Sequence, residues 1–261
     1  MSVKKHLQLC AICIKLETMD RTSDVFTFSI ITIATLLRIA ITVIFFQAIY
    51  GQVQMIGGLD ISHMYVLLGT YFLIDGISWA TYTRGFIRIM RLVDKGNFDL
   101  LLVTPVNLKA YLSYRFIDVI FSTPAIIAAI LLIIYGAQTS AEPIYLITYI
   151  PFVLIGFVLH FSFTLMLGTI NFFYIIETPQ YLRNSIMKLG EYPITIFKGL
   201  AKMVFTFVIP LAFMFTVPAR AFFGDVGYMD VITGVSLALI FYLLSSVFWN
   251  AGLRHYKSAQ G

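Results

Sequence analysis

Six long apolar runs dominate this sequence and limit the folds that are open to it. They lie at about 25–49, 64–83, 110–135, 144–176, 194–217 and 230–250. A helix needs roughly 20 apolar residues to cross about 30 Å of hydrocarbon, so each run is long enough to cross a bilayer. Charged residues make up only 12% of the chain, about half of their share in a soluble domain. The runs predict an all-α integral membrane protein with six transmembrane helices.

The lengths of the runs also set the domain organisation. The run at 144–176 exceeds one straight span, so we expect it to tilt, kink or continue into the cytosol. A transmembrane β-barrel is excluded, because its strands would alternate apolar and polar residues over about ten positions. The runs leave no room for a separate soluble domain. We therefore divide the chain into an N-terminal segment, 1–24, and a single six-helix transmembrane domain, 25–261.

The N-terminal segment mixes apolar side chains with Lys4, Lys5 and Arg21. This composition predicts a helix that lies along the membrane surface, and its polar interruptions exclude a cleavable signal peptide. Cys10 and Cys13 form a lone C-x-x-C pair, whereas structural zinc normally takes four ligands. We interpret these cysteines as small apolar residues of the interfacial helix and predict no metal site.

The charges between the runs predict the orientation. Basic residues gather on alternate connections, while the connections near 50–63, 136–143 and 218–229 hold Asp60, Glu142 and Asp225 but only Arg220 as a cation. Positive residues favour the cytoplasmic side during insertion. We therefore expect a multi-pass protein of the cell membrane with both termini cytoplasmic. The net formal charge of +5 follows from this placement and does not indicate nucleic-acid binding.

The connection after the second run carries the most informative polar stretch, from Arg84 to Tyr111. Gly96 ends the preceding helix, Asn97 is placed to cap a short new one, and Thr104-Pro105 stops it. Asn107 is placed to cap the third span. The pattern predicts a short cytosolic helix at 97–103, within a segment at about 94–107. We expect it to display four apolar side chains below the membrane: Phe98, Leu100, Leu101 and Leu102.

Contiguous exposed apolar surface usually marks an interaction site, so this helix favours a docking role. The alternative is a tight loop that lies on the lipid headgroups. The stretch G-N-F-D-L-L-L-V-T-P-V, residues 96–106, resembles the "G-x-x-D-x-L-L-x-x-P-x" signature of the six-helix ABC-2 type permeases. Tyr192-Pro193, the segment 207–213 and the C-terminal stretch 252–261 are similar to further parts of the same family.

The resemblance implies a permease subunit of an ABC exporter. It implies that two such subunits, identical or homologous, form the translocation pathway, and that the coupling segment contacts a separate dimer of ATP-binding subunits. The residues expected to couple are Gly96, Phe98, Asp99, Leu100, Leu101, Leu102 and Pro105. The chain has no G-x-x-x-x-G-K-[ST] loop to hold ATP phosphates. We therefore expect no catalysis and no cofactor in this chain, with ATP and Mg in the partner.

Three charged residues fall within the predicted spans: Arg38, Asp75 and Asp118. Charges inside a membrane usually face protein or water, and they usually find a partner. Counting along the helices at about 1.5 Å per residue, we expect an Arg38–Asp75 bridge between the first two spans. Asp118 is expected to pair with Arg115, three residues before it.

Two other classes of protein stay open. An ATPase-independent secondary carrier would need inverted repeats or broken helices, and neither is clear in the sequence. A membrane-embedded lipid-modifying enzyme would explain Asp75-Gly76 followed by Ala80 and Arg84, but no downstream carboxylates complete a metal site. The four histidines are also scattered along the chain.

Overall fold

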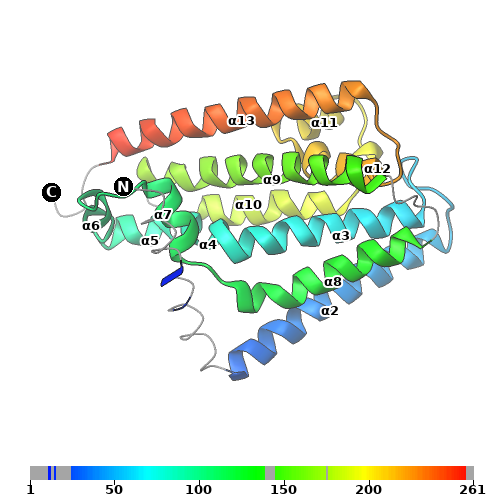
Figure 1. The fold of residues 1–261 in the computed structure, drawn as a ribbon, viewed down its shortest axis with the longest axis horizontal. Helices are drawn as coiled ribbons and strands as arrows, with labels where there is room; N and C mark the ends of the chain where they lie inside the picture. Colours follow the sequence, from blue (N-terminus) through cyan, green and yellow to red (C-terminus); the bar gives the residue numbers. More distant parts are fainter. Residues whose placement is uncertain (1–10, 13–14, 16–24, 139–144, 175, 257–261) are drawn as a thin grey trace.

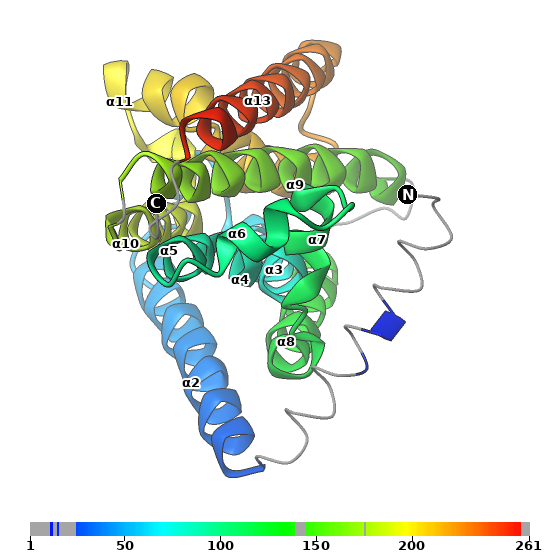
Figure 2. The ribbon, with the colours of Figure 1, turned by 90° about the vertical axis from the view of Figure 1, so that its left-hand side faces the viewer.

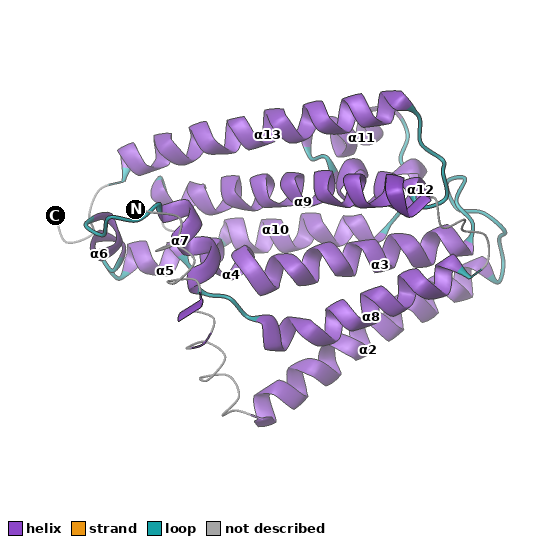
Figure 3. Ribbon diagram, in the orientation of Figure 1, coloured by secondary structure: helices purple, strands orange, loops and turns teal. Residues whose placement is uncertain are grey.

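The protein is a bundle of helices that run along its long axis (Figure 1). The computed structural model describes residues 11–12, 15, 25–138, 145–174 and 176–256, and every element named within them is a helix (Figure 3). The predicted interfacial helix at 1–24 lies almost entirely outside the described residues. Five long helices form the frame: α2 (Val25–Tyr50), α3 (Ile61–Ser78), α8 (Val119–Ala137), α9 (Tyr145–Thr169) and α13 (Tyr228–His255).

Four helices in the described part of the chain are long and apolar enough to cross a membrane. They are Val25–Tyr50, Val119–Ala137, Leu146–Phe172 and Tyr228–His255, and a bent pair of shorter helices raises the number to five. Helix α3 is not among them, although it lies at the centre of the bundle. Within the described residues, the structure thus confirms a mostly helical protein with several helices able to span a membrane.

The two ends of the bundle differ in content. One end holds the start of α2, the end of α13 and the short helix α6 (Phe98–Leu102), and we call it the α6 end (Figure 1). The other end holds the connection 51–60, and we call it the loop end. Viewed from the α6 end, α2 leans away from the remaining helices (Figure 2). Only Ile39 and Phe46 of α2 are buried.

Helix α3 is enclosed because small residues let its neighbours approach closely. A Cβ added to Gly69 would lie 2.8 Å from the carbonyl oxygen of Ala129 in α8, and one added to Gly136 would lie 2.9 Å from that of Ser62. Small residues at helix interfaces are the usual route to close packing in membranes. The main core surrounds α3. A second apolar cluster, the α6-end cluster, consists of Tyr82, Phe86, Ile89, Val93, Phe98, Leu112, Leu165, Phe172 and Trp249.

The second and third predicted spans are interrupted near the α6 end. After α3 the chain continues through a π-helical turn, Trp79–Thr83, into α4 (Arg84–Ile87) and α5 (Ile89–Asp94). The predicted span at 110–135 is two helices, α7 (Leu108–Arg115) and α8. Asp118 breaks the run and caps α8, because its side chain accepts a hydrogen bond from the N–H of Phe121.

The predicted fifth run at 194–217 is not one straight helix. Its apolar part is a bent pair, Gly199–Val208 and Ala212–Ala221, with 69° between its two halves. Pro210 lies at the bend and lacks the N–H that a continuous helix needs. The Ala221 end of the pair lies at the loop end, since Thr148 near the start of α9 donates a hydrogen bond to the carbonyl of Ala221. The start of the pair follows Thr195, which lies beside Gly57 at the same end. The pair consists of α11 (Gly199–Met203), the π-helices Val204–Val208 and Ala212–Thr216, and α12 (Val217–Ala221).

The segment just before this pair runs between the two ends of the bundle. It comprises α10 (Thr178–Lys188) and two 3-10 turns, Leu189–Glu191 and Ile194–Ile196. Pro179 lines a small cavity together with Phe86 of α4. Thr195 lies beside Gly57 of the connection at the loop end. The fourth run is α9, and a 3-10 turn, Ile170–Phe172, extends it.

The closest backbone approach in the α6 half predicts a sensitive position. A Cβ on Gly85 would overlap the backbone carbonyl oxygen of Leu112, and no side-chain rotation can relieve this overlap. We expect Gly85→Ala to separate α4 from α7 and cost about 1–3 kcal/mol, seen as a lower melting midpoint in detergent. Gly227→Ala is the matched control, because nothing lies within 4 Å of its Cβ position. Equal midpoints for the two variants would contradict this packing.

Candidate functional site

The segment around α6 begins with a turn that favours glycine. Gly96 has a φ of 67°, and its N–H donates to the carbonyl of Val93 at 3.0 Å. The prediction that Gly96 ends the preceding helix is confirmed. The predicted cap at Asn97 is wrong, because its side chain makes no capping hydrogen bond. Asn107 does cap the next helix, accepting a hydrogen bond from the N–H of Ala110.

Phe98 is directed into the protein rather than displayed. Its side chain is fully buried, and its ring centroid lies 4.9 Å from that of Phe172 and 5.2 Å from that of Tyr256. The prediction that Phe98 forms part of the exposed apolar surface is therefore wrong. Phe98 instead attaches α6 to the α6-end cluster, which includes residues of α9 and α13.

Asp99 provides a polar attachment beside this apolar one. Its carboxylate accepts a hydrogen bond of 2.9 Å from the hydroxyl of Tyr256. Partial burial and the neighbouring Asp99 carboxylate raise the pKa of Tyr256 to about 12. The phenol therefore stays protonated at physiological pH and remains a donor. Phe98 and Asp99 together hold α6 against the end of α13.

The opposite face of α6 is apolar and exposed. Leu100, Leu102 and Val103 expose 66%, 44% and 81% of their surface, and we call these three residues the docking patch. Leu101 is half-buried and packs on the α6-end cluster. Pro105 is exposed just beyond the helix. Of the four residues predicted to be displayed, Leu100 and Leu102 are exposed in the structure.

The charges within the spans pair differently from the prediction. Arg38 bonds through Nη2 to a carboxylate oxygen of Glu191 at 2.6 Å and to the hydroxyl of Tyr71 at 3.0 Å. Asp75 accepts from Arg183 at 3.0 Å. The predicted Arg38–Asp75 bridge is thus replaced by two ion pairs. Each pair joins one of the first two spans to the segment 178–191.

His160 of α9 completes the second ion pair. It is fully buried, and its Nε2 lies 3.0 Å from Nη2 of Arg183. Because an arginine only donates, Nε2 accepts, and the proton is on Nδ1. Nδ1 lies 2.7 Å from the hydroxyl oxygen of Tyr82, which therefore accepts from it. The group links α3, α9 and α10 by hydrogen bonds within the bundle.

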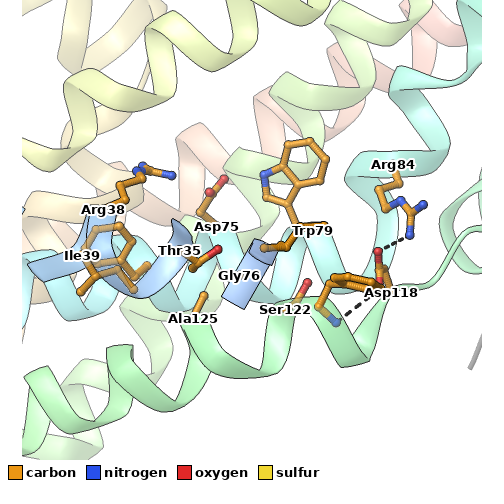
Figure 4. A pocket seen from close by; sticks show the side chains of 13 residues that line it. Thr35, Arg38, Ile39, Asp75, Gly76, Trp79, Arg84, Asp118, Ser122 and Ala125 are labelled. Atoms are coloured by element: carbon orange, nitrogen blue, oxygen red, sulfur yellow. Dashed lines mark hydrogen bonds and ion pairs between the residues drawn. The ribbon is translucent and has the colours of Figure 1, made fainter. Parts of the chain in front are cut away.

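Asp118 forms its ion pair with Arg84 of α4, across the π-helical turn (Figure 4). The predicted pairing of Asp118 with Arg115 is wrong. The reason is the break at 116–118, which removes the helical spacing on which that prediction rested. No group of three metal-ligating side chains occurs among the described residues.

These features define a polytopic membrane protein with a short helix at one end whose apolar patch has no cover within the described chain. Comparison with known proteins gives the family. Residues 36–260 match the model of the ABC-2 family transporter proteins, so the chain belongs to this family and is a membrane transport component. No curated protein and no solved structure matches it.

The Asp75–Arg183 pair predicts non-additive effects on stability. Removing one member of a buried ion pair costs about 3–5 kcal/mol, because it leaves an uncompensated charge. We expect Asp75→Asn or Arg183→Gln alone to lower the melting midpoint strongly. The double variant should recover part of the loss, since no charge is then left unpaired. A double variant whose loss equals the sum of the two single losses would show that the pair is not coupled.

Proposed function

We propose that this chain is the permease subunit of an ABC exporter, in which two permease subunits form the pathway and a separate pair of ATP-binding subunits supplies the energy. The family supports the transport role. The docking patch carries the proposal for the partner, because three exposed apolar side chains on an anchored helix form a surface suited to a protein contact. The direction of transport follows from resemblance to exporters of this type.

For the topology we propose six crossings, with both termini on the cytoplasmic side. The fifth crossing is made by residues 178–197, and the bent pair at 199–221 enters and leaves the membrane from the loop end. This arrangement keeps the basic α6 end in the cytosol, as expected from the bias of positive residues. It also keeps the carboxylates of Asp60 and Asp225 on the outside.

Coupling would use α6 as a rigid contact. Phe98 packs with Phe172 at the end of α9, and Phe172 packs with Trp249 of α13 at 5.2 Å. A displacement of the docking patch is therefore transmitted directly to α9 and α13. Because packed elements shift as units and deform little, we expect α9 and α13 to move with α6 when the ATP-binding subunits close.

The second permease subunit would lie against exposed apolar surface. Helix α2 presents most of its surface outward and buries only two side chains, so it offers the largest unpacked helix face. In a bilayer this face contacts either lipid tails or another protein. We propose that part of it contacts the second subunit, which is a further copy of this chain or a homologue.

The docking patch is tested by charge substitution and co-purification. The tagged chain is expressed together with the products of its neighbouring genes and extracted in mild detergent. Leu100→Asp together with Val103→Asp should lower the amount of ATP-binding subunit that co-purifies by about tenfold or more. The reason is that the interface loses two apolar side-chain contacts. ATPase activity stimulated by the permease should fall in parallel.

Asn97→Asp is the matched control, because Asn97 is exposed next to α6 but outside the docking patch. This variant should retain the partner. Equal retention by the Leu100/Val103 variant and wild type would contradict the coupling site. A stable complex without any nucleotide-binding subunit would instead favour a secondary carrier or a lipid-modifying enzyme.

A further inference from the structure

A charged cavity lies between α2, α3 and α8 (Figure 4). Its volume is about 350 Å³, within the range of roughly 300–1,000 Å³ that small-molecule sites occupy. Its charged lining consists of Arg38, Asp75, Arg84 and Asp118. Charges inside a membrane are costly, and they mark functional sites by default.

Two of these four charges pair with each other, whereas Arg38 and Asp75 pair with Glu191 and Arg183, which lie outside the lining. Arg84 and Asp118 form an ion pair whose side chains are 13% and 11% exposed. They close one side of the cavity without adding net charge. Arg38 and Asp75 face the cavity from the other side, and Figure 4 shows their charged groups near one another with no bond between them.

Arg38 and Asp75 line the cavity, and each keeps a group that makes no hydrogen bond. Both hydrogen bonds of the Arg38 side chain are made by Nη2, so Nε and Nη1 have no hydrogen-bond partner in the described part of the chain. Asp75 contacts Arg183 and His160 through Oδ1, which leaves Oδ2. The Arg38 side chain is 44% exposed. One donor group for an anion thus lies beside one acceptor for a cation.

The opposite charges of Arg38 and Asp75 determine which ligand headgroup fits the cavity. A purely anionic group bound by Arg38 would also face the Asp75 carboxylate, and a purely cationic group bound by Asp75 would face Arg38. Specificity often rests on such unfavourable pairings. A headgroup with both an anion and an ammonium matches both residues. Hydroxyls of Thr35 and Ser122 line the same cavity.

Apolar grooves continue from this cavity along α2 and α8. One groove, of about 530 Å³, shares Ile39 with the charged cavity. A second, of about 610 Å³, shares Leu36, Ala128 and Leu131 with the first. The grooves have the apolar lining and continuity that a hydrocarbon chain needs. Cavity and grooves together have the polarity pattern of an amphiphile.

We propose that this chain binds a zwitterionic amphiphile, with the headgroup between Arg38 and Asp75 and the hydrocarbon chain between α2 and α8. The occupant is a lipid of the bilayer that carries a phosphate and an ammonium. Binding does not need ATP or the ATP-binding subunit. If no such lipid binds, the proposed coupling at the docking patch is not affected.

Binding is measured on the purified full chain by native mass spectrometry with three amphiphiles of equal chain length: lysophosphatidylethanolamine, lysophosphatidylglycerol and an alkyltrimethylammonium. The wild type should prefer the zwitterion by about tenfold, since the anionic probe meets the like charge of Asp75 and the cationic probe meets the like charge of Arg38. Arg38→Gln should shift the preference toward the cation and Asp75→Asn toward the anion. Soluble phosphoethanolamine should not compete at the same concentration.

Filling the cavity gives a test that leaves its charges in place. Thr35→Phe from α2 and Ser122→Leu from α8 should each lower lysophosphatidylethanolamine binding by about tenfold, because the headgroup then meets a side chain. Thr42→Phe is the matched control two turns along α2, outside the cavity lining. The proposal is overturned if both filling variants bind like the control, if the three amphiphiles bind equally, or if phosphoethanolamine competes as well as the lysolipid.

Discussion

The ion pair between Asp75 and Arg183 is the interaction on which the arrangement of the membrane helices depends. Arg183 is 2% exposed, so an unpaired charge there would be strongly destabilising. Its bonds to Asp75 and His160 place the polar helix α10 between α3 and α9. The pair of Arg38 with Glu191 repeats this pattern for α2. These two ion pairs thereby stabilise the segment 178–191 inside the bundle, although it is too polar to enter lipid alone.

At the α6 end, buried apolar side chains rather than ion pairs hold a short segment against the bundle. Phe98 is buried among Phe172 and Tyr256, while Leu100 and Val103 on the other face are exposed. A helix of five residues has little stability of its own, so the buried face decides its position. A short segment can transmit force only if it is held in this way. The exposed face is then left for a partner.

The apolar runs were sufficient to predict α2, α9 and α13, because each of these helices is one long, uninterrupted apolar segment. They were not sufficient for residues 178–221. Arg183 and Glu191 lie outside the spans predicted from the runs, yet they form ion pairs with Asp75 of α3 and Arg38 of α2. The Asp118 pairing failed for a related reason, since a break at 116–118 is not visible in local spacing. The α6 helix was predicted from Gly96 and Pro105, but with both faces apolar the sequence could not tell buried Phe98 from exposed Leu100.

The central claim is that the docking patch touches an ATP-binding subunit, and in-cell photo-crosslinking tests it most directly. A photoreactive amino acid at position 103 should give an adduct with a nucleotide-binding protein, because Val103 is 81% exposed. The same group at position 98 is buried and should react within the chain, and at position 229 of the loop end it should give no such adduct. Adducts from position 103 that contain no nucleotide-binding protein would contradict the account.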